Sequence, residues 1–193
     1  MDLTQLLNSN VGKQIVSGIS DQTQTTEQDT ASVVNAAAPV LMGMLQKNAS
    51  TPAGAQGIQG ALEEHDGSIL NNLAGFFGSG DTSDGNGILG HILGSNRGSV
   101  EKELSEKTGV SMPDVSKILA MLAPVIMGYL GQQSRQTGQQ GGGLTDLLGG
   151  LMGGSDASSI GGNILSSILK QAGGAQGKGG GLGDVLGGLF GKK

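Results

Sequence analysis

The sequence contains no cysteine and no tryptophan, and its aromatic residues are limited to three Phe and one Tyr among 193 residues. Without cysteine, the chain can form no disulfide framework, no thiolate nucleophile and no Cys-ligated metal site. With so few aromatic side chains, a core must be built from Leu, Ile, Val, Met and Ala. The first residues, Met1 to Gln5, lack the basic and apolar segments of a signal peptide, so we expect a cytoplasmic protein.

Basic residues are also scarce, with 11 Lys and Arg against 16 Asp and Glu and a formal net charge of −5. The charge is uneven, at −7 over residues 1–134 and +2 over residues 135–193. Nucleic-acid binding depends on basic groups that neutralise phosphates and release counterions. The acidic body of the chain therefore argues against nucleic acid as a partner.

One apolar stretch occurs twice in the chain. Residues 38–45 (APVLMGML) are echoed 85 positions later by residues 123–130 (APVIMGYL). The same offset pairs further positions: Asp29 with Asp114, Val33 with Ile118, and Ile15 with Val100. Such an echo indicates two copies of one supersecondary unit packed against each other.

The repeated stretches have the periodicity of helices. Val115, Ile118, Leu122 and Val125 recur at spacings of three and four, and a second apolar stripe runs beside them. A helix that is apolar around most of its girth is buried, and the uncharged run over 118–130 is shorter than the roughly 20 residues that span a bilayer. We therefore predict two core helices and no transmembrane segment, with a kink at each internal proline, Pro39 and Pro124.

Turn and capping signals predict the remaining elements. Thr26 with Asp29, and Ser111 with Asp114, have the spacing of a capping box and mark the starts of the two core helices. The first should end near Lys47 and the second near Gln132. Shorter helices are expected over 2–7, 11–20, 57–64, 67–77, 87–94 and, capped by Ser99, 100–107, with loops beginning at 48 and over 78–87.

A glycine-rich tail follows a polar linker over 134–143. It contains two near-copies, residues 143–153 (GLTDLLGGLMG) and 181–191 (GLGDVLGGLFG), with a third apolar piece over 163–170. Interior glycine costs a helix about 1 kcal/mol per residue relative to alanine, so we expect these segments to be mostly disordered alone. They could become amphipathic helices on a partner protein, a membrane surface or another copy of the chain; a tail without a defined role is the alternative.

The motif over 87–94 (GILGHILG), the paired Ala-Pro-Val-Leu/Ile-Met-Gly stretches and the Gly-Leu-Gly-rich tail together resemble the bacterial proteins grouped as DUF937. The resemblance covers roughly residues 1–155, with the motifs in the expected order. It implies a small multihelical, YidB-like domain. It implies no activity, because the family is defined without one.

Several patterns suggest sites that their context does not support. Residues 105–118 fit a helix-turn-helix spacing, but the second helix offers Lys117 beside Asp114 and then becomes apolar, so a structural corner is favoured over DNA binding. Residues 85–90 (GNGILG) match a dinucleotide fingerprint without the required preceding strand. In residues 81–87, a calcium loop would place His91 where a bidentate Glu belongs.

The two histidines offer no metal site. His65 lies beside Glu63, Glu64 and Asp66, but adjacent helical residues point in different directions, so a solvated helix end is expected. His91 lies between apolar neighbours and is expected to be capped or partly buried. We therefore predict no catalytic, cofactor-binding or metal-ligating residue, and no cofactor.

Together these patterns predict an all-α protein with an internally duplicated, pseudo-twofold domain over residues 1–134 and a flexible tail over residues 135–193. The favoured function is a non-enzymatic interaction or scaffold protein that binds itself or another protein, through the tail or the Met-lined helices. A DNA-binding regulator that uses the corner at 100–121 is the alternative, and an enzyme ranks third.

Overall fold

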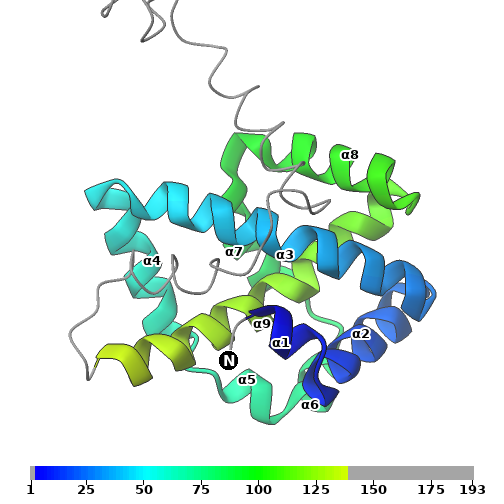
Figure 1. The fold of residues 1–193 in the computed structure, drawn as a ribbon, viewed down its shortest axis with the longest axis horizontal. Coiled ribbons are helices and arrows are strands. Elements are labelled where there is room, and N and C mark those ends of the chain that lie inside the picture. The colour runs from blue at the N-terminus through cyan, green and yellow to red at the C-terminus, as the bar shows by residue number, and fades with distance from the viewer. Residues whose placement is uncertain (1–2, 139–193) are drawn as a thin grey trace, which may run out of the picture.

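The structure is a computed structural model that describes residues 3–138. All regular elements in this range are helices, in agreement with the predicted all-α class (Figure 1). In chain order they are α1 (Leu3–Leu7), α2 (Asn10–Thr23), α3 (Glu27–Ala49), α4 (Pro52–Glu64), α5 (Ser68–Asn71), α6 (Leu73–Ser79), α7 (Ser83–Leu93), the 3₁₀ turn η1 (Gly94–Asn96), α8 (Arg97–Thr108) and α9 (Met112–Gly138).

The two repeated stretches lie in α3 and α9, which pack against each other at the centre of the bundle (Figure 1). Every residue from Ile118 to Gly131 is buried, and most of α3 between Val33 and Leu45 is buried too. Both are core helices, as predicted from the apolar residues on most of their faces. Each helix continues through its internal proline, Pro39 or Pro124, and the kinks stay a prediction.

By length and composition alone, α9 is the one described helix that could cross a membrane, over Met112–Gln136. In this fold, 83% of that apolar window is buried inside the molecule. The other helices cover it, because α2, α4, α5, α7 and α8 all pack against α9. The apolar surface of α9 is thus used to build the core.

The short helices α2 and α8, which precede α3 and α9 in the chain, each pack against both of these long helices. The helix bounds recur at the offset of 85: α2 ends at Thr23 and α8 at Thr108. Both helices then end in a left-handed residue, Gln24 at φ 58° and Gly109 at φ 76°. The two helix pairs therefore share their local geometry.

Both predicted cap residues cap their helices, and in each case the acidic partner accepts a hydrogen bond from the hydroxyl of the cap. The Thr26 hydroxyl accepts a hydrogen bond from the Asp29 backbone N–H at 3.0 Å and donates one to the Asp29 carboxylate at 2.8 Å. The Ser111 hydroxyl does the same with Asp114, at 3.4 Å and 2.6 Å. The acidic side chains also lie where the positive end of the helix dipole favours them. These contacts explain why α3 and α9 begin at positions that are 85 residues apart.

Two predicted loops are helical instead. Helix α4 begins at Pro52, capped by the Thr51 hydroxyl, because proline is well tolerated in the first turn. Helix α7 begins at Ser83, so the second half of the loop predicted over 78–87 is wrong. Glycine at position 85 lets α7 approach α9 closely, since a Cβ there would overlap the Ala120 carbonyl oxygen. The glycine is used for close packing and does not break the helix.

Other boundaries differ more modestly. The helix predicted over 67–77 is divided at Asn72, whose side chain accepts a hydrogen bond from the Gly75 backbone N–H and starts α6. Helix α8 begins at Arg97, earlier than the cap predicted at Ser99, and α2 runs on to Thr23. Helix α9 continues beyond Gln132 to Gly138, across the predicted domain boundary at residue 134. The tail segments over 143–153, 163–170 and 181–191 lie outside the described residues.

Candidate functional site

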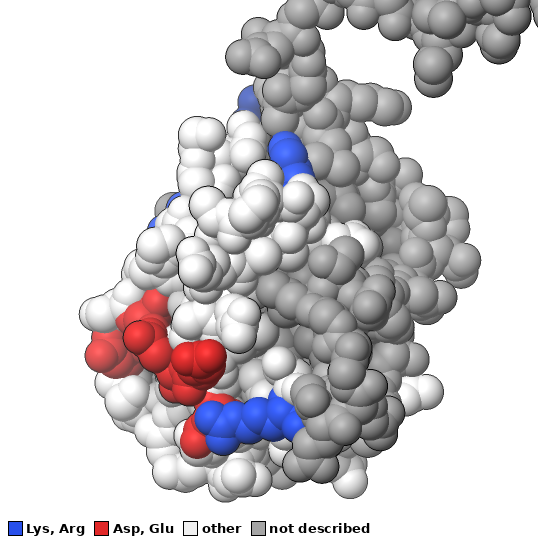
Figure 2. Space-filling model, turned by 90° about the vertical axis from the view of Figure 1, so that its left-hand side faces the viewer, with Lys and Arg blue, Asp and Glu red and all other residues white. Residues whose placement is uncertain are grey.

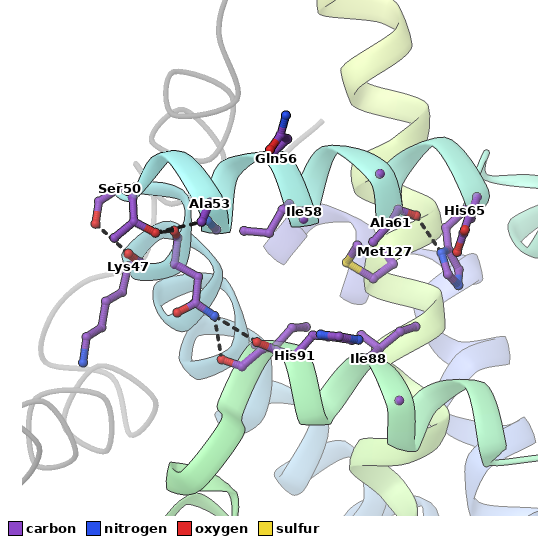
Figure 3. A pocket seen from close by; sticks show the side chains of 18 of the residues that line it. Lys47, Ser50, Ala53, Gln56, Ile58, Ala61, His65, Ile88, His91 and Met127 are labelled. Carbon is purple, nitrogen blue, oxygen red and sulfur yellow. Dashed lines mark hydrogen bonds between the residues drawn. The ribbon is translucent and has the colours of Figure 1, made fainter.

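A groove with a volume of about 850 Å³ opens between α4 and α7 (Figure 3). Its walls are these two helices, one end is formed by the last turn of α3, and Met127 reaches it from α9. The floor is apolar and consists of side chains that also belong to the core: Ile58, Ile88, Ile92 and Met127. The groove thus reaches the edge of the core, where each of these four side chains is at most 9% exposed.

Glycines leave parts of the groove walls without side chains. A Cβ built at Gly57, Gly60 or Gly87 would meet no atom within 4 Å, so these positions face open space. Gly54 differs, because a Cβ there would overlap the Asn48 carbonyl oxygen. A bound group could therefore approach the backbone of both wall helices closely.

One end of the groove is closed by an amide from α3. The Asn48 side-chain nitrogen donates hydrogen bonds to the carbonyl oxygens of His91 at 3.1 Å and Ile92 at 3.0 Å (Figure 3). These carbonyls belong to the last turn of α7 and have no partner within their own helix. Asn48 thereby satisfies them and holds α7 at a set distance from α3.

The other end is closed by a histidine–aspartate pair. His65, which follows α4, places Nδ1 2.7 Å from the Ala61 carbonyl oxygen and Nε2 3.0 Å from the Asp84 carboxylate on α7. Both partners have acceptor oxygens, so the site favours a ring that is protonated on both nitrogens. Burial lowers the pKa of His65, but the hydrogen bonds to Asp84 and Ala61 and the charges of Asp84 and Glu64 raise it above its ordinary value overall.

Charges of opposite sign lie at the two ends. Lys47 is exposed beside the Asn48 end, and Glu64 and Asp84 are exposed at the His65 end. Figure 2, which views the side of the molecule that carries α4, shows acidic side chains gathered on this face. The groove is therefore an apolar channel with one cationic end and one acidic end.

The histidine predictions have different outcomes. The prediction of a solvated helix end at His65 is wrong, because the side chain is only 16% exposed and contacts Asp84, which is distant in sequence. Among the described residues, no group of three metal-ligating side chains occurs. The prediction that His91 is capped or partly buried is wrong in its burial: the side chain is exposed at the rim of the groove, because α7 turns its neighbours toward α9 instead.

The glycine-rich patterns over 81–90 lie at the start of α7. The Asp81 carboxylate accepts a hydrogen bond from the Ser83 backbone N–H at 2.8 Å, which makes a turn that leads into the helix. Residues 85–90 are helical, whereas a dinucleotide fingerprint needs a turn between a strand and a helix. Neither pattern has the local structure that its ligand requires.

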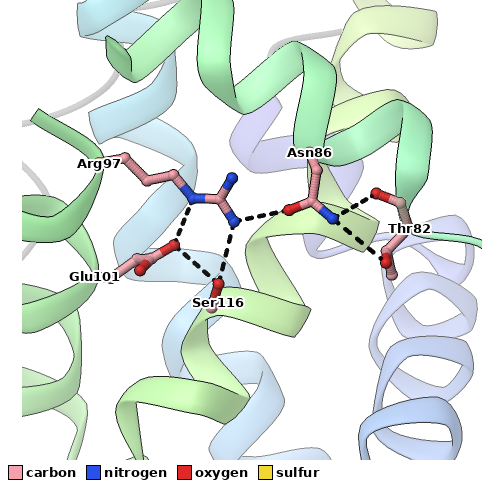
Figure 4. Close-up of polar contacts among 5 residues, drawn as sticks. All are labelled: Thr82, Asn86, Arg97, Glu101 and Ser116. Atoms are coloured by element: carbon pink, nitrogen blue, oxygen red, sulfur yellow. Dashed lines mark hydrogen bonds and ion pairs between the residues drawn. The ribbon is translucent and has the colours of Figure 1, made fainter. Parts of the chain in front are cut away.

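A polar network holds the helix-turn-helix-like corner together (Figure 4). Arg97 Nε donates to the Glu101 carboxylate at 2.7 Å, and its Nη2 donates to Asn86 at 2.7 Å and to the Ser116 hydroxyl at 3.1 Å. Ser116 in turn donates to Glu101 at 2.9 Å, and Glu101 is only 8% exposed. The network joins α7, α8 and α9, so it is a structural clamp.

The same corner is a poor surface for DNA. Residues 97–121 contain four basic and four acidic side chains. The Lys117 ammonium lies 4.0 Å from Asp114, and from Ile118 onward α9 is buried. Only the first turns of α9 could enter a groove of DNA, and they carry no net positive charge.

The sequence analysis did not find the groove residues. Pro52, Gly54 and Gly57 suggested a loop that begins at residue 48, so only the second half of α4, over 57–64, was predicted as a helix. The signal that could have revealed this wall of the groove is the spacing of Ile58, Ala61 and Leu62 after the helix start at Thr51 and Pro52. This spacing places an apolar stripe on one face of a helix, with glycines beside it. The pairing of His65 with Asp84 has no local signal, because the two residues meet only through the packing of α4 and α7.

Comparison with known proteins adds a family and no activity. No curated protein and no solved structure matches the chain. The family model described as "Bacterial protein of unknown function (DUF937)" matches residues 5–133, which is more than half of the chain and nearly all of the described helices. The chain therefore belongs to the DUF937 family of bacterial proteins, as its motifs suggested.

Proposed function

We propose that this protein is a non-enzymatic binding protein that accepts an apolar helical segment of a protein in the groove between α4 and α7. The observation that carries the proposal is the floor of core side chains that lies open between glycine walls. Elsewhere the described surface exposes few large apolar side chains, with Met112 the prominent case at 42%. An open groove with an apolar floor and few polar groups is typical of a binding site.

The dimensions of the groove favour a short helix. The wall from Gly54 to His65 is about 16 Å long at 1.5 Å per residue, and the facing part of α7 is slightly shorter. A helix of nine or ten residues is about 14–15 Å long, which lies between the lengths of the two walls. Low glycine walls let two helix backbones come close together, as small residues do at other tightly packed helix pairs.

The histidine at the groove supports binding over catalysis. Both ring nitrogens of His65 are engaged with oxygen atoms, of Ala61 and Asp84, so neither is placed to take a proton from a group bound in the groove. The pair instead joins α4 to α7 and sets the width of the groove at one end.

Two parts of the hypothesis drawn from the sequence bear on this proposal: the internal duplication and self-association through Met-lined helices. The matching bounds and caps of α2–α3 and α8–α9 support an internal duplication of one helix pair. Contact through Met-lined helices is not part of the proposal, because these methionines lie in the core: Met42, Met44, Met121 and Met127. Any self-association would then use the groove.

The test is a matched pair of glycine substitutions in the full chain. Gly87 faces the groove, and Gly90, one turn later on α7, faces open space outside it. A fluorescein-labelled model helix of Leu, Ala and Lys, with Leu at i, i+3, i+4 and i+7, is titrated and its anisotropy measured. We expect Gly87→Gln to weaken binding at least tenfold and Gly90→Gln to change it less than twofold. Equal affinity in the two variants would place the binding site elsewhere.

A further inference from the structure

The strongest remaining question is which segment the groove accepts, and the answer rests on the proposed function. We propose that the occupant is the last repeat of this same chain, residues 181–193, which docks into the groove of its own molecule. The sequence of that segment is GLGDVLGGLFGKK. Three features support the assignment: its apolar spacing, its charge pattern and the place where the described chain ends.

The apolar residues of the segment fit one helical face. Leu182, Val185, Leu186 and Leu189 recur at i, i+3, i+4 and i+7, and Phe190 lies beside them. Docked as a helix, the nine residues from 182 to 190 would be about 14 Å long, close to the length of the groove walls. Its interior glycines disfavour the helix in isolation, so the apolar floor must stabilise it on docking.

The charges of the segment match those of the groove. Asp184 lies near its start, and Lys192 and Lys193 lie at its end. Docked with Asp184 toward Lys47, the segment brings its two lysines to the end of the groove where Glu64 lies beside the Asp84–His65 pair. The other near-copy, residues 143–153, has Asp146 but no lysine after its apolar residues. The charge pattern therefore selects the last repeat over the first.

The described chain ends close to the acidic end of the groove. A Cβ at Gly131 on α9 would overlap the His65 carbonyl oxygen, and Arg135 lies 3.9 Å from Asp66. A linker as long as residues 139–181 spans roughly 36 Å if it behaves as a Gly-rich coil, which exceeds the length of the groove. Such a linker gives an effective concentration in the millimolar range, so docking within one molecule outcompetes docking between molecules at micromolar protein.

The test measures whether the chain blocks its own groove. A fluorescein-labelled peptide of residues 181–193 is titrated into the full chain, and into a full-chain variant with Leu186→Asp and Leu189→Asp. We expect the variant to bind the peptide at least tenfold more tightly, because its own tail no longer competes. Adding Gly87→Gln should remove this binding, and adding Gly90→Gln should not. A peptide with Lys192→Glu and Lys193→Glu should bind several-fold more weakly at low salt.

The outcomes separate this inference from the proposed function. If the variant binds the model helix of Leu, Ala and Lys but gains no affinity for the 181–193 peptide, the groove is a binding site and the tail is not its occupant. If the variant binds neither peptide, both proposals fail. If the peptide binds Gly87→Gln as well as it binds Gly90→Gln, the tail docks elsewhere. Docking within one molecule would be overturned by two results together: the wild-type chain binds the 181–193 peptide about as tightly as the Leu186→Asp, Leu189→Asp variant does, and the wild-type chain forms dimers in sedimentation.

Discussion

The close crossing of α7 over α9 makes a sharp prediction about one glycine. Alanine at position 85 would place a methyl group on the carbonyl oxygen of Ala120, and a backbone carbonyl cannot rotate away as a side chain can. Helix α7 must then move away from α9 and loosen the buried contacts of Ile88 and Leu89. Overpacking of this kind costs about 3 kcal/mol at the upper end of its range. The better helix propensity of alanine returns about 1 kcal/mol, so the net loss is about 2 kcal/mol.

Gly87→Ala, two residues along the same helix, is the matched control. Its methyl group would face open space, so the free energy of unfolding should rise by up to about 1 kcal/mol. For a domain of this size, each kcal/mol shifts Tm by about 3–4 °C, so we expect Gly85→Ala to melt roughly 7 °C lower and Gly87→Ala roughly 3 °C higher. Circular dichroism at 222 nm measures both. A Gly85→Ala variant as stable as the wild type would refute the close contact between α7 and α9.

Three further predictions concern polar and strained positions. Since the folded-state pKa of His65 is raised, its bond to Asp84 stabilises the fold fully below about pH 6.5 and less as the pH rises through the folded pKa. The difference in unfolding free energy between wild type and His65→Gln, measured by urea melts at each pH, should therefore shrink as the pH rises. A difference that stays constant with pH would contradict this. Glu101→Ala leaves Arg97 without its buried partner and should lower the urea-unfolding free energy by about 1–3 kcal/mol, whereas Glu101→Gln should lose less. Gln24→Gly relieves a positive φ and should raise stability by about 0.5–1 kcal/mol; a lower midpoint in urea would show that the side chain stabilises the turn.

The parts of the fold that depend on local sequence were predictable. Helices α3 and α9 carry an apolar pattern over six or more turns, and Thr26 and Ser111 each have the capping partner that starts the helix. Burial along α9 agrees with this pattern, because a helix that is apolar all round lies in a protein core or in lipid, and here the other helices cover it.

The errors come from reading glycine as a signal for loops. Gly54 and Gly85 both lie inside helices, each at a place where a Cβ would overlap the backbone of a neighbouring segment. Such close contacts form between residues that are distant in sequence or in separate helices, so composition in a local window cannot distinguish them from turns. The prediction for His91 failed for a related reason. Its apolar neighbours pack on α9, so the His91 side chain lies on the opposite, exposed side of α7.

Two groups of glycines in this domain have opposite consequences for stability. At Gly12, Gly85 and Gly131 a Cβ would overlap neighbouring backbone, so the fold itself requires glycine. At Gly57, Gly60 and Gly87 there is open space, and alanine at all three would add roughly 3 kcal/mol of helix propensity. Open glycines also occur away from the groove, as at Gly90, so glycine alone does not identify a site. What distinguishes the three wall positions is the apolar floor between them, which a larger side chain would cover. Substitutions there can therefore separate binding from folding, because they should stabilise the helices while they fill the groove.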